Sequence, residues 1–133
     1  MEKQTVALFG ASEKGDFQIA YHCHRVEQLA DLLGHPPPYS RGIYMGIQAL
    51  MYQRNVIYIR VREEGFSFQD YYKGLRLLTS QRTVRELAAL GIPGVGDSAL
   101  LEATTAICGI YDSILITSED DLYDYLTGMQ RAA

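Results

Sequence analysis

The chain of 133 residues has little cysteine, no tryptophan and no excess of basic residues. Two cysteines are too few for the disulfide framework that holds many small secreted domains together. With 12 basic and 16 acidic residues the formal net charge is −4, which excludes the positive surface of a general nucleic-acid binder. The apolar runs fall well short of the roughly 20 residues that a membrane-spanning helix needs, so we expect no membrane partner.

The rest of the composition is that of an ordinary folded domain. Hydrophobic residues make up 47% of the chain and charged residues 21%, close to the average for globular proteins. We therefore expect residues 1–133 to form one domain with its own hydrophobic core. No basic and then apolar segment precedes residue 10, so we expect no secretion by that route and a cytoplasmic location.

Short apolar runs alternate with amphipathic segments along the chain. Three runs are typical of strands buried in a parallel sheet: residues 5–9, 56–61 and 113–117. A helix is expected from Asp16, which can cap it, to Gly34, which can end it, because apolar residues recur between them every three or four positions. This alternation predicts the α/β class, as a Rossmann-like three-layer sandwich with a mainly parallel sheet.

Further helices are predicted from their first residues. Sequences that match a capping box, fully or in part, begin at three places: Ser67–Asp70, Thr83–Glu86 and Ser118–Asp121. The box at Thr83 predicts a helix with Gly91 as its C-terminal stop. Asp97 or Ser98 is expected to cap another helix, and residues 42–53 fit a helical stripe.

Three glycine-containing segments could share one edge of this sheet. Ligands of parallel sheets bind outside the carboxyl ends of the strands, where free N–H groups can hold a phosphate. We therefore predict a site for a nucleotide or another phosphate-bearing small molecule, formed by these residues: Gly10, Ser12, Lys14, Gly15, Ser40, Arg41, Gly42, Gly46, Gly94 and Gly96. Lys14 and Arg41 would hold the phosphate. None of the segments matches GxGxxG or the Walker A pattern, so ordinary turns stay an alternative.

Two carboxylates argue against this site. Asp16 and Asp97 are expected at helix N-termini, where a carboxylate satisfies the N–H groups that a phosphate would use and repels an anion. They favour a second hypothesis, a non-catalytic domain of the same fold that works through a protein interface. The ten tyrosines are compatible with it, and we expect a homo-oligomer.

His22 and His24 do not predict a metal site. On a helix, residues two apart point about 200° away from each other, so these two imidazoles cannot bind one ion. Cys23 is expected on the buried face of that helix, where a thiol without a base is inert. We expect neither a metal nor a cofactor.

Taken in order, the three segments resemble motifs of the LONELY GUY or "lysine decarboxylase-like" family. Residues 9–15 resemble its first glycine and serine block, residues 41–46 its Gly-Leu-Met-Gly block, and residues 93–96 its pro-gly-gly-x-gly-thr block. The first segment alone also resembles the opening of coenzyme A-binding Rossmann domains.

This resemblance implies a Rossmann-like fold that binds nucleoside monophosphates, either as a sensor or as a hydrolase that cleaves the base from the ribose phosphate. For the hydrolase it implies a glutamate and an arginine. Glu102 would be the acid or base at the N-glycosidic bond, and Arg76, or Lys73 in its place, would stabilise the charge.

Overall fold

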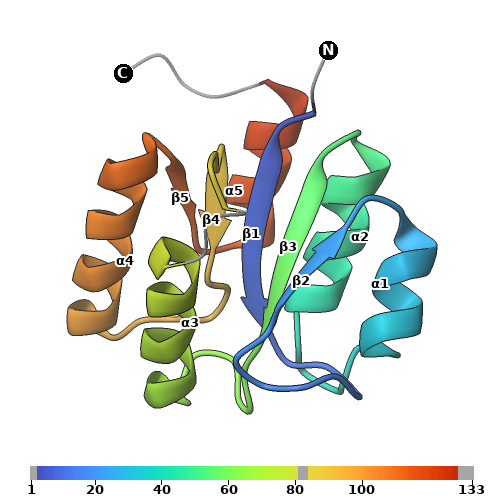
Figure 1. Ribbon diagram of the computed structural model, residues 1–133, viewed down its shortest axis with the longest axis horizontal. Coiled ribbons are helices and arrows are strands. Elements are labelled where there is room, and N and C mark those ends of the chain that lie inside the picture. The colour runs from blue at the N-terminus through green and yellow to red at the C-terminus, as the bar shows by residue number, and fades with distance from the viewer. Residues whose placement is uncertain (1–2, 81–83, 129–133) are drawn as a thin grey trace.

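Strands and helices alternate along the described part of the chain, residues 3–80 and 84–128 of a computed structural model (Figure 1). In chain order the elements are β1 (Thr5–Gly10), β2 (Ala20–Cys23), α1 (Val26–Leu33), α2 (Gly42–Met51), β3 (Asn55–Arg60), α3 (Phe68–Ser80), β4 (Ala89–Gly91), α4 (Ser98–Tyr111), β5 (Ile114–Ile116) and α5 (Glu119–Thr127). No helix among these residues is long and apolar enough to cross a membrane.

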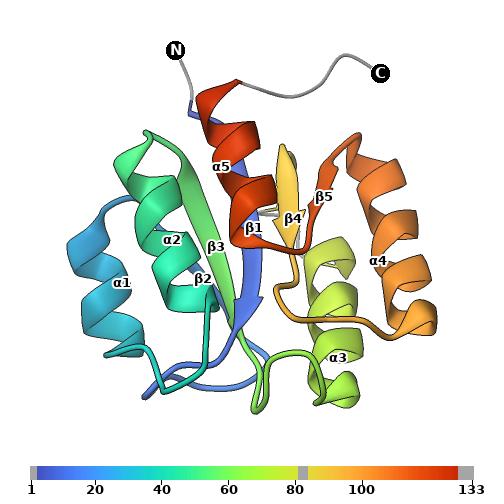
Figure 2. The ribbon, with the colours of Figure 1, turned by 180° about the vertical axis from the view of Figure 1, so that it is seen from behind.

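The strands form one sheet of five, in the order β2-β3-β1-β4-β5. β3, β1, β4 and β5 run parallel, and β2 pairs antiparallel with β3 at one edge. Helices α1, α2 and α5 cover one face of the sheet, and α3 and α4 cover the other (Figures 1 and 2). This confirms the predicted α/β class and the Rossmann-like three-layer arrangement.

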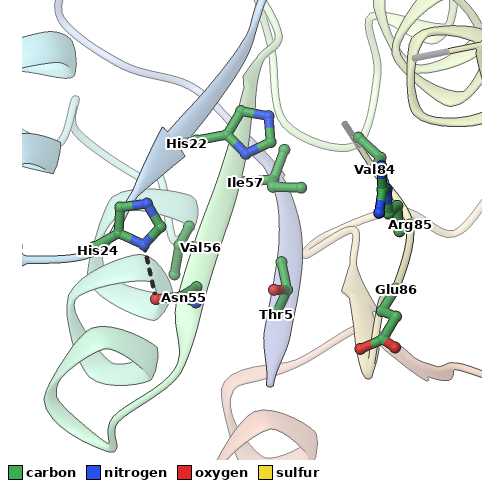
Figure 3. Close-up of a pocket in the computed structure, with 9 residues that line it drawn as sticks. All are labelled: Thr5, His22, His24, Asn55, Val56, Ile57, Val84, Arg85 and Glu86. Carbon is green, nitrogen blue, oxygen red and sulfur yellow. Dashed lines mark hydrogen bonds between the residues drawn. The ribbon is translucent and has the colours of Figure 1, made fainter. Parts of the chain in front are cut away.

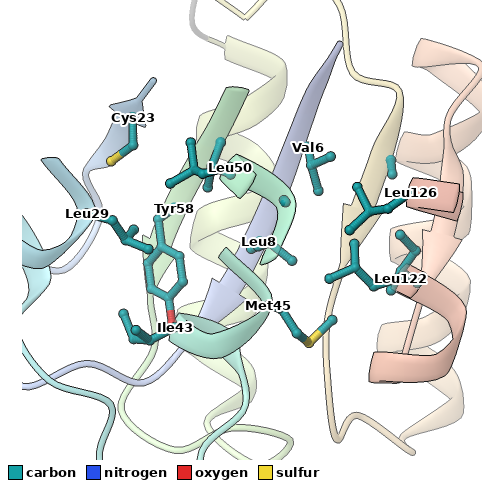
Figure 4. Close-up of a cluster of buried hydrophobic side chains, with 14 of the residues drawn as sticks. Val6, Leu8, Cys23, Leu29, Ile43, Met45, Leu50, Tyr58, Leu122 and Leu126 are labelled. Atoms are coloured by element: carbon teal, nitrogen blue, oxygen red, sulfur yellow. The ribbon is translucent and has the colours of Figure 1, made fainter. Parts of the chain in front are cut away.

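Each face of the sheet has its own hydrophobic core. Val6, Leu8 and Tyr58 face α1, α2 and α5 (Figure 4), whereas Ala7 and Phe9 face α3 and α4. Successive residues of β1 are therefore buried on opposite faces, which is why the run is continuously apolar rather than alternating.

The predicted helix from Asp16 to Gly34 is wrong in its first half. Residues Ala20–Cys23 form β2, and α1 begins only at Val26. Tyr21 is partly buried in the α1 and α2 layer and Cys23 is fully buried there, so the same apolar residues fit a strand period. As a strand, these residues form backbone hydrogen bonds with the edge of β3. As a helix, they would leave the N–H and C=O groups at that edge without these partners.

Side-chain capping of α1 also differs from the prediction. The Gln28 side-chain oxygen accepts hydrogen bonds from the N–H groups of His24 (2.6 Å) and Arg25 (3.0 Å). Asp16 lies in the loop before β2, where its N–H donates to the Tyr21 hydroxyl at 2.6 Å. Asp16 is therefore not at a helix N-terminus, and this part of the objection to an anion site is wrong.

The helix predicted from the box at Thr83 is also wrong within the described residues. Thr83 itself lies outside them, and residues 84–88 are not helical. They lead into β4, whose last residue is Gly91, so this glycine ends a strand. Burial of Val84 and Leu87 against α3 and α4, with pairing of β4 to β1 and β5, outweighs the local capping signal.

Candidate functional site at the carboxyl edge

Three segments that the sequence predicts, and one further connection, lie at the carboxyl edge of the parallel strands. β1 ends at Gly10, α2 begins at Gly42, and the segment of Gly94 follows β4. The fourth is the connection from β3 to α3, which contains Gly65. A Cβ added at Gly65 would lie 2.5 Å from the Gly94 carbonyl oxygen, so these two backbones touch.

A single carboxylate, in the connection from β3 to α3, joins two of the others. Glu64 accepts a hydrogen bond from the N–H of Ala11 (2.8 Å) and another from that of Gly42 (3.0 Å), both through Oε2. Its Oε1 accepts from the N–H of Arg41 at 2.7 Å. We call the N–H groups of Ala11, Arg41 and Gly42 the amide cradle. Three donors from two distant segments therefore point at one anion at the start of α2, where the helix dipole also favours negative charge.

Two buried tyrosines hold the backbone around Glu64. The Tyr58 hydroxyl donates to the carbonyl of Ala11 at 2.9 Å, and the Tyr71 hydroxyl accepts from the N–H of Gly65 at 2.8 Å. Burial, and then the nearby Glu64 charge, raises the pKa of Tyr58 well above its ordinary value. Burial likewise raises the pKa of Tyr71, against the opposing hydrogen bond from Gly65. Both phenols therefore stay neutral at physiological pH.

A cavity of about 260 Å³ opens beside the amide cradle. Of the three cradle residues only Ala11 lines it, together with the segment before α2 and the connection from β3 to α3: Ala11, Pro37, Pro38, Tyr39, Ser40, Arg62, Glu63, Glu64 and Phe66. Tyr39 is fully exposed and has a positive φ of 62°, which is uncommon for a residue with a side chain. Phe66 is 67% exposed. The cavity thus has aromatic residues in its lining and Glu64 as an acceptor.

Arginines supply the positive charge of this edge. Arg62 donates to the buried carboxylate of Asp70 at 2.8 Å, and its backbone N–H donates to the same carboxylate at 2.9 Å. The Arg41 Nε lies 3.1 Å from a Glu119 carboxylate oxygen, and both side chains are about half exposed or more. Arg41 is therefore free to exchange this exposed partner for another anion.

Several predicted residues of the first segment lie outside the amide cradle. The N–H of Lys14 donates to the carbonyl of Leu33 at the end of α1 (3.1 Å), and the Lys14 carbonyl accepts from the Ser12 hydroxyl (2.8 Å). Gly15, at φ 106°, is also next to Leu33. This segment is thus docked on the C-terminus of α1 and does not lead into a helix N-terminus.

The remaining predicted glycines and Ser40 have separate environments. Ser40 lines the cavity, but its hydroxyl donates to the Pro37 carbonyl. Gly46 lies within α2, where an added Cβ would be 3.0 Å from a Leu29 methyl group. Gly94 has a positive φ of 81°, whereas an added Cβ at Gly96 would meet no atom within 4 Å.

Asp97 caps α4 as predicted. Its carboxylate accepts from the N–H of Leu100 at 2.9 Å. The N-terminus of α4 is therefore already satisfied by a carboxylate, and the objection raised for this position holds.

The two predicted catalytic residues lie apart from the cavity lining. Glu102 is exposed on α4, and Arg76 is exposed on α3. Neither lines the cavity beside the amide cradle, and no ion pair within the described residues joins them. Their roles at an N-glycosidic bond stay predictions.

A second cavity, of about 310 Å³, lies at the opposite edge of the sheet (Figure 3). His22 of β2 and His24, the first residue after β2, both line it, and His24 Nδ1 lies 2.9 Å from the Asn55 side-chain oxygen. The argument that helix geometry separates the two imidazoles is therefore wrong, because neither residue lies in a helix and both line one cavity. Within residues 3–80 and 84–128, no three His, Cys, Asp or Glu residues are grouped to hold a metal ion.

Comparisons of the chain with protein-family models, with curated proteins and with solved structures found no match.

Proposed function

We propose that the protein binds a phosphate-bearing small molecule of the nucleotide class in the cavity at the carboxyl edge. The observation that supports this most is the convergence of three backbone N–H groups, from Ala11, Arg41 and Gly42, on one anionic group. N–H groups at the end of a strand and the start of a helix are common phosphate ligands in proteins.

The position and lining of the cavity agree with this class of ligand. The cavity lies beyond the carboxyl ends of β1 and β3, and this edge of the sheet is where ligands of α/β proteins bind. The exposed rings of Tyr39 and Phe66 are suited to contact with a planar base. At about 260 Å³ the cavity accommodates at most a mononucleotide-sized ligand. The resemblance to the LONELY GUY family points to the same class.

The proposal is tested by isothermal titration calorimetry with AMP, adenosine and inorganic phosphate. AMP is expected to bind most tightly, because it combines the phosphate with a base. Phe66→Ala should weaken AMP binding by roughly tenfold, the loss of one stacking contact. Ile110→Ala, on α4 and 70% exposed, is the matched control and should bind like the wild type. Absence of AMP binding to the wild type would contradict the proposal.

A homo-oligomer is the second candidate function, and one surface favours it. Tyr44 and Met51 of α2 are more than half exposed, and Tyr52 packs edge to face on Tyr123 of α5 at 6.4 Å between ring centroids. Aromatic residues and methionine are enriched at protein interfaces. Light scattering during size-exclusion chromatography measures the mass, and Met51→Lys should dissociate an oligomer built on this surface. We also propose that the protein is located in the cytoplasm, and fractionation of cells tests this location.

A further inference from the structure

We infer that Glu64 is an internal competitor of the ligand: its carboxylate occupies the amide cradle in the free protein, and the phosphate of the ligand takes its place. This inference rests on the proposed function, because it concerns how that same site is opened. The carboxylate that occupies the N–H groups a phosphate would use is therefore that of Glu64, and not that of Asp16 as the sequence predicts.

The geometry makes the two anions mutually exclusive. Glu64 uses both of its oxygens to accept the three N–H groups of the cradle, at 2.7 to 3.0 Å. Each N–H can donate well to one acceptor, so a phosphate that binds the cradle must take these donors from the carboxylate. Two anions held at one point would also repel each other strongly.

The carboxylate is positioned so that it can leave. Glu64 lies in the connection between β3 and α3, is only partly buried, and lines the cavity itself. The ion pairs within the described residues are Arg41–Glu119 and Arg62–Asp70, so Glu64 balances no cation there. Arg62 lines the same cavity, so a displaced carboxylate stays beside a positive charge. Displacement therefore needs a side-chain rotation and no break in the sheet.

This arrangement selects for ligands by charge. A neutral nucleoside cannot replace the carboxylate at three N–H donors, whereas a phosphate dianion can, since charge-assisted hydrogen bonds are the stronger ones. Part of the binding free energy of AMP is used to remove Glu64 from the cradle. The measured affinity is therefore lower than it would be for an empty cradle.

The test compares wild type, Glu64→Ala and the control Asp31→Ala, which removes an exposed carboxylate on α1 that does not line the cavity. Glu64→Ala is expected to bind AMP roughly tenfold more tightly than the wild type, since the ligand no longer displaces hydrogen bonds to a charged group. Its melting temperature should be lower in buffer and should rise with inorganic phosphate or acetate, which replace the missing anion. Asp31→Ala should match the wild type in both measurements.

Each other outcome overturns the inference in a defined way. If the wild type binds AMP and Glu64→Ala binds it equally or more weakly, displacement is wrong while the proposed function stands. If neither protein binds AMP, both are wrong. Should Glu64→Ala fail to fold, Glu64→Gln keeps the size and one acceptor without the charge, and it is then judged by the same comparison with the wild type.

Discussion

Gly10 at the end of β1 and Gly42 at the start of α2 lie so close that a Cβ on either would be 2.7 Å from the Cα of the other. The Tyr58 hydroxyl fills the remaining space beside both glycines. Because of this approach, the N–H groups of Ala11 and Gly42 reach the same Glu64 oxygen. The amide cradle thus depends on two positions where no side chain fits.

Gly42→Ala should therefore destabilise the protein by about 1–3 kcal/mol, the usual effect of forcing an extra methyl group into a close contact. Urea unfolding gives the free energy of unfolding. The control is Gly96→Ala, where an added Cβ meets nothing within 4 Å and stability should be unchanged or slightly higher. Equal unfolding free energies for the two variants would contradict the packing described between Gly10 and Gly42.

Arg41→Ala should weaken AMP binding while leaving stability within about 1 kcal/mol of the wild type, because its ion pair with Glu119 is exposed. Calorimetry and thermal unfolding separate the two effects. Glu119→Gln breaks the same ion pair but keeps the Arg41 guanidinium, so its AMP affinity should equal or exceed that of the wild type. If both variants lost AMP affinity to the same extent, the ion pair with Glu119, and not the Arg41 cation itself, would be what AMP binding requires.

Both cysteines should resist thiol reagents in the folded protein. Burial raises the pKa of Cys23 to about 11 and also raises that of Cys108, so little thiolate forms at pH 8. Reaction with Ellman's reagent is expected to be slow in buffer and to reach two thiols per chain in denaturant. Rapid labelling of either cysteine without denaturant would show that its core layer opens readily.

Stability should fall as the pH drops below about 6.5, and His22 should account for part of the loss. Burial, and then the neighbouring His24, lowers the pKa of His22 below its ordinary value of 6.5. The unfolded chain therefore binds a proton at His22 more readily than the folded chain, so acid favours unfolding. The difference in unfolding free energy between pH 7.5 and 5.5 should be smaller for His22→Gln. An identical difference in both proteins would exclude this contribution.

The sequence predicts the class of the fold because that information is local. Continuous apolar runs indicate buried parallel strands. Asp97 indicates the start of α4 because its carboxylate accepts a hydrogen bond from Leu100, three residues further along the chain. β2 escapes prediction because its apolar residues fit the periods of a strand and of a helix equally, and only the edge of β3 decides between them.

The candidate site is predictable only in part, for a related reason. Glycines at the ends of strands indicate the carboxyl edge, and Gly10 and Gly42 do meet there. Glu64, however, is 53 residues from Ala11 and 22 from Gly42 in the chain, and nothing in its neighbouring sequence signals three backbone donors.

The most direct test of the account is a two-dimensional amide NMR titration of the ¹⁵N-labelled wild type with AMP. We predict that the resonances of Ala11, Arg41 and Gly42 move most, as their hydrogen bonds pass from a carboxylate to a phosphate. Resonances around His22, at the opposite edge of the sheet, should stay in place. Unchanged cradle resonances at saturating AMP would contradict the central claim that this edge holds the ligand.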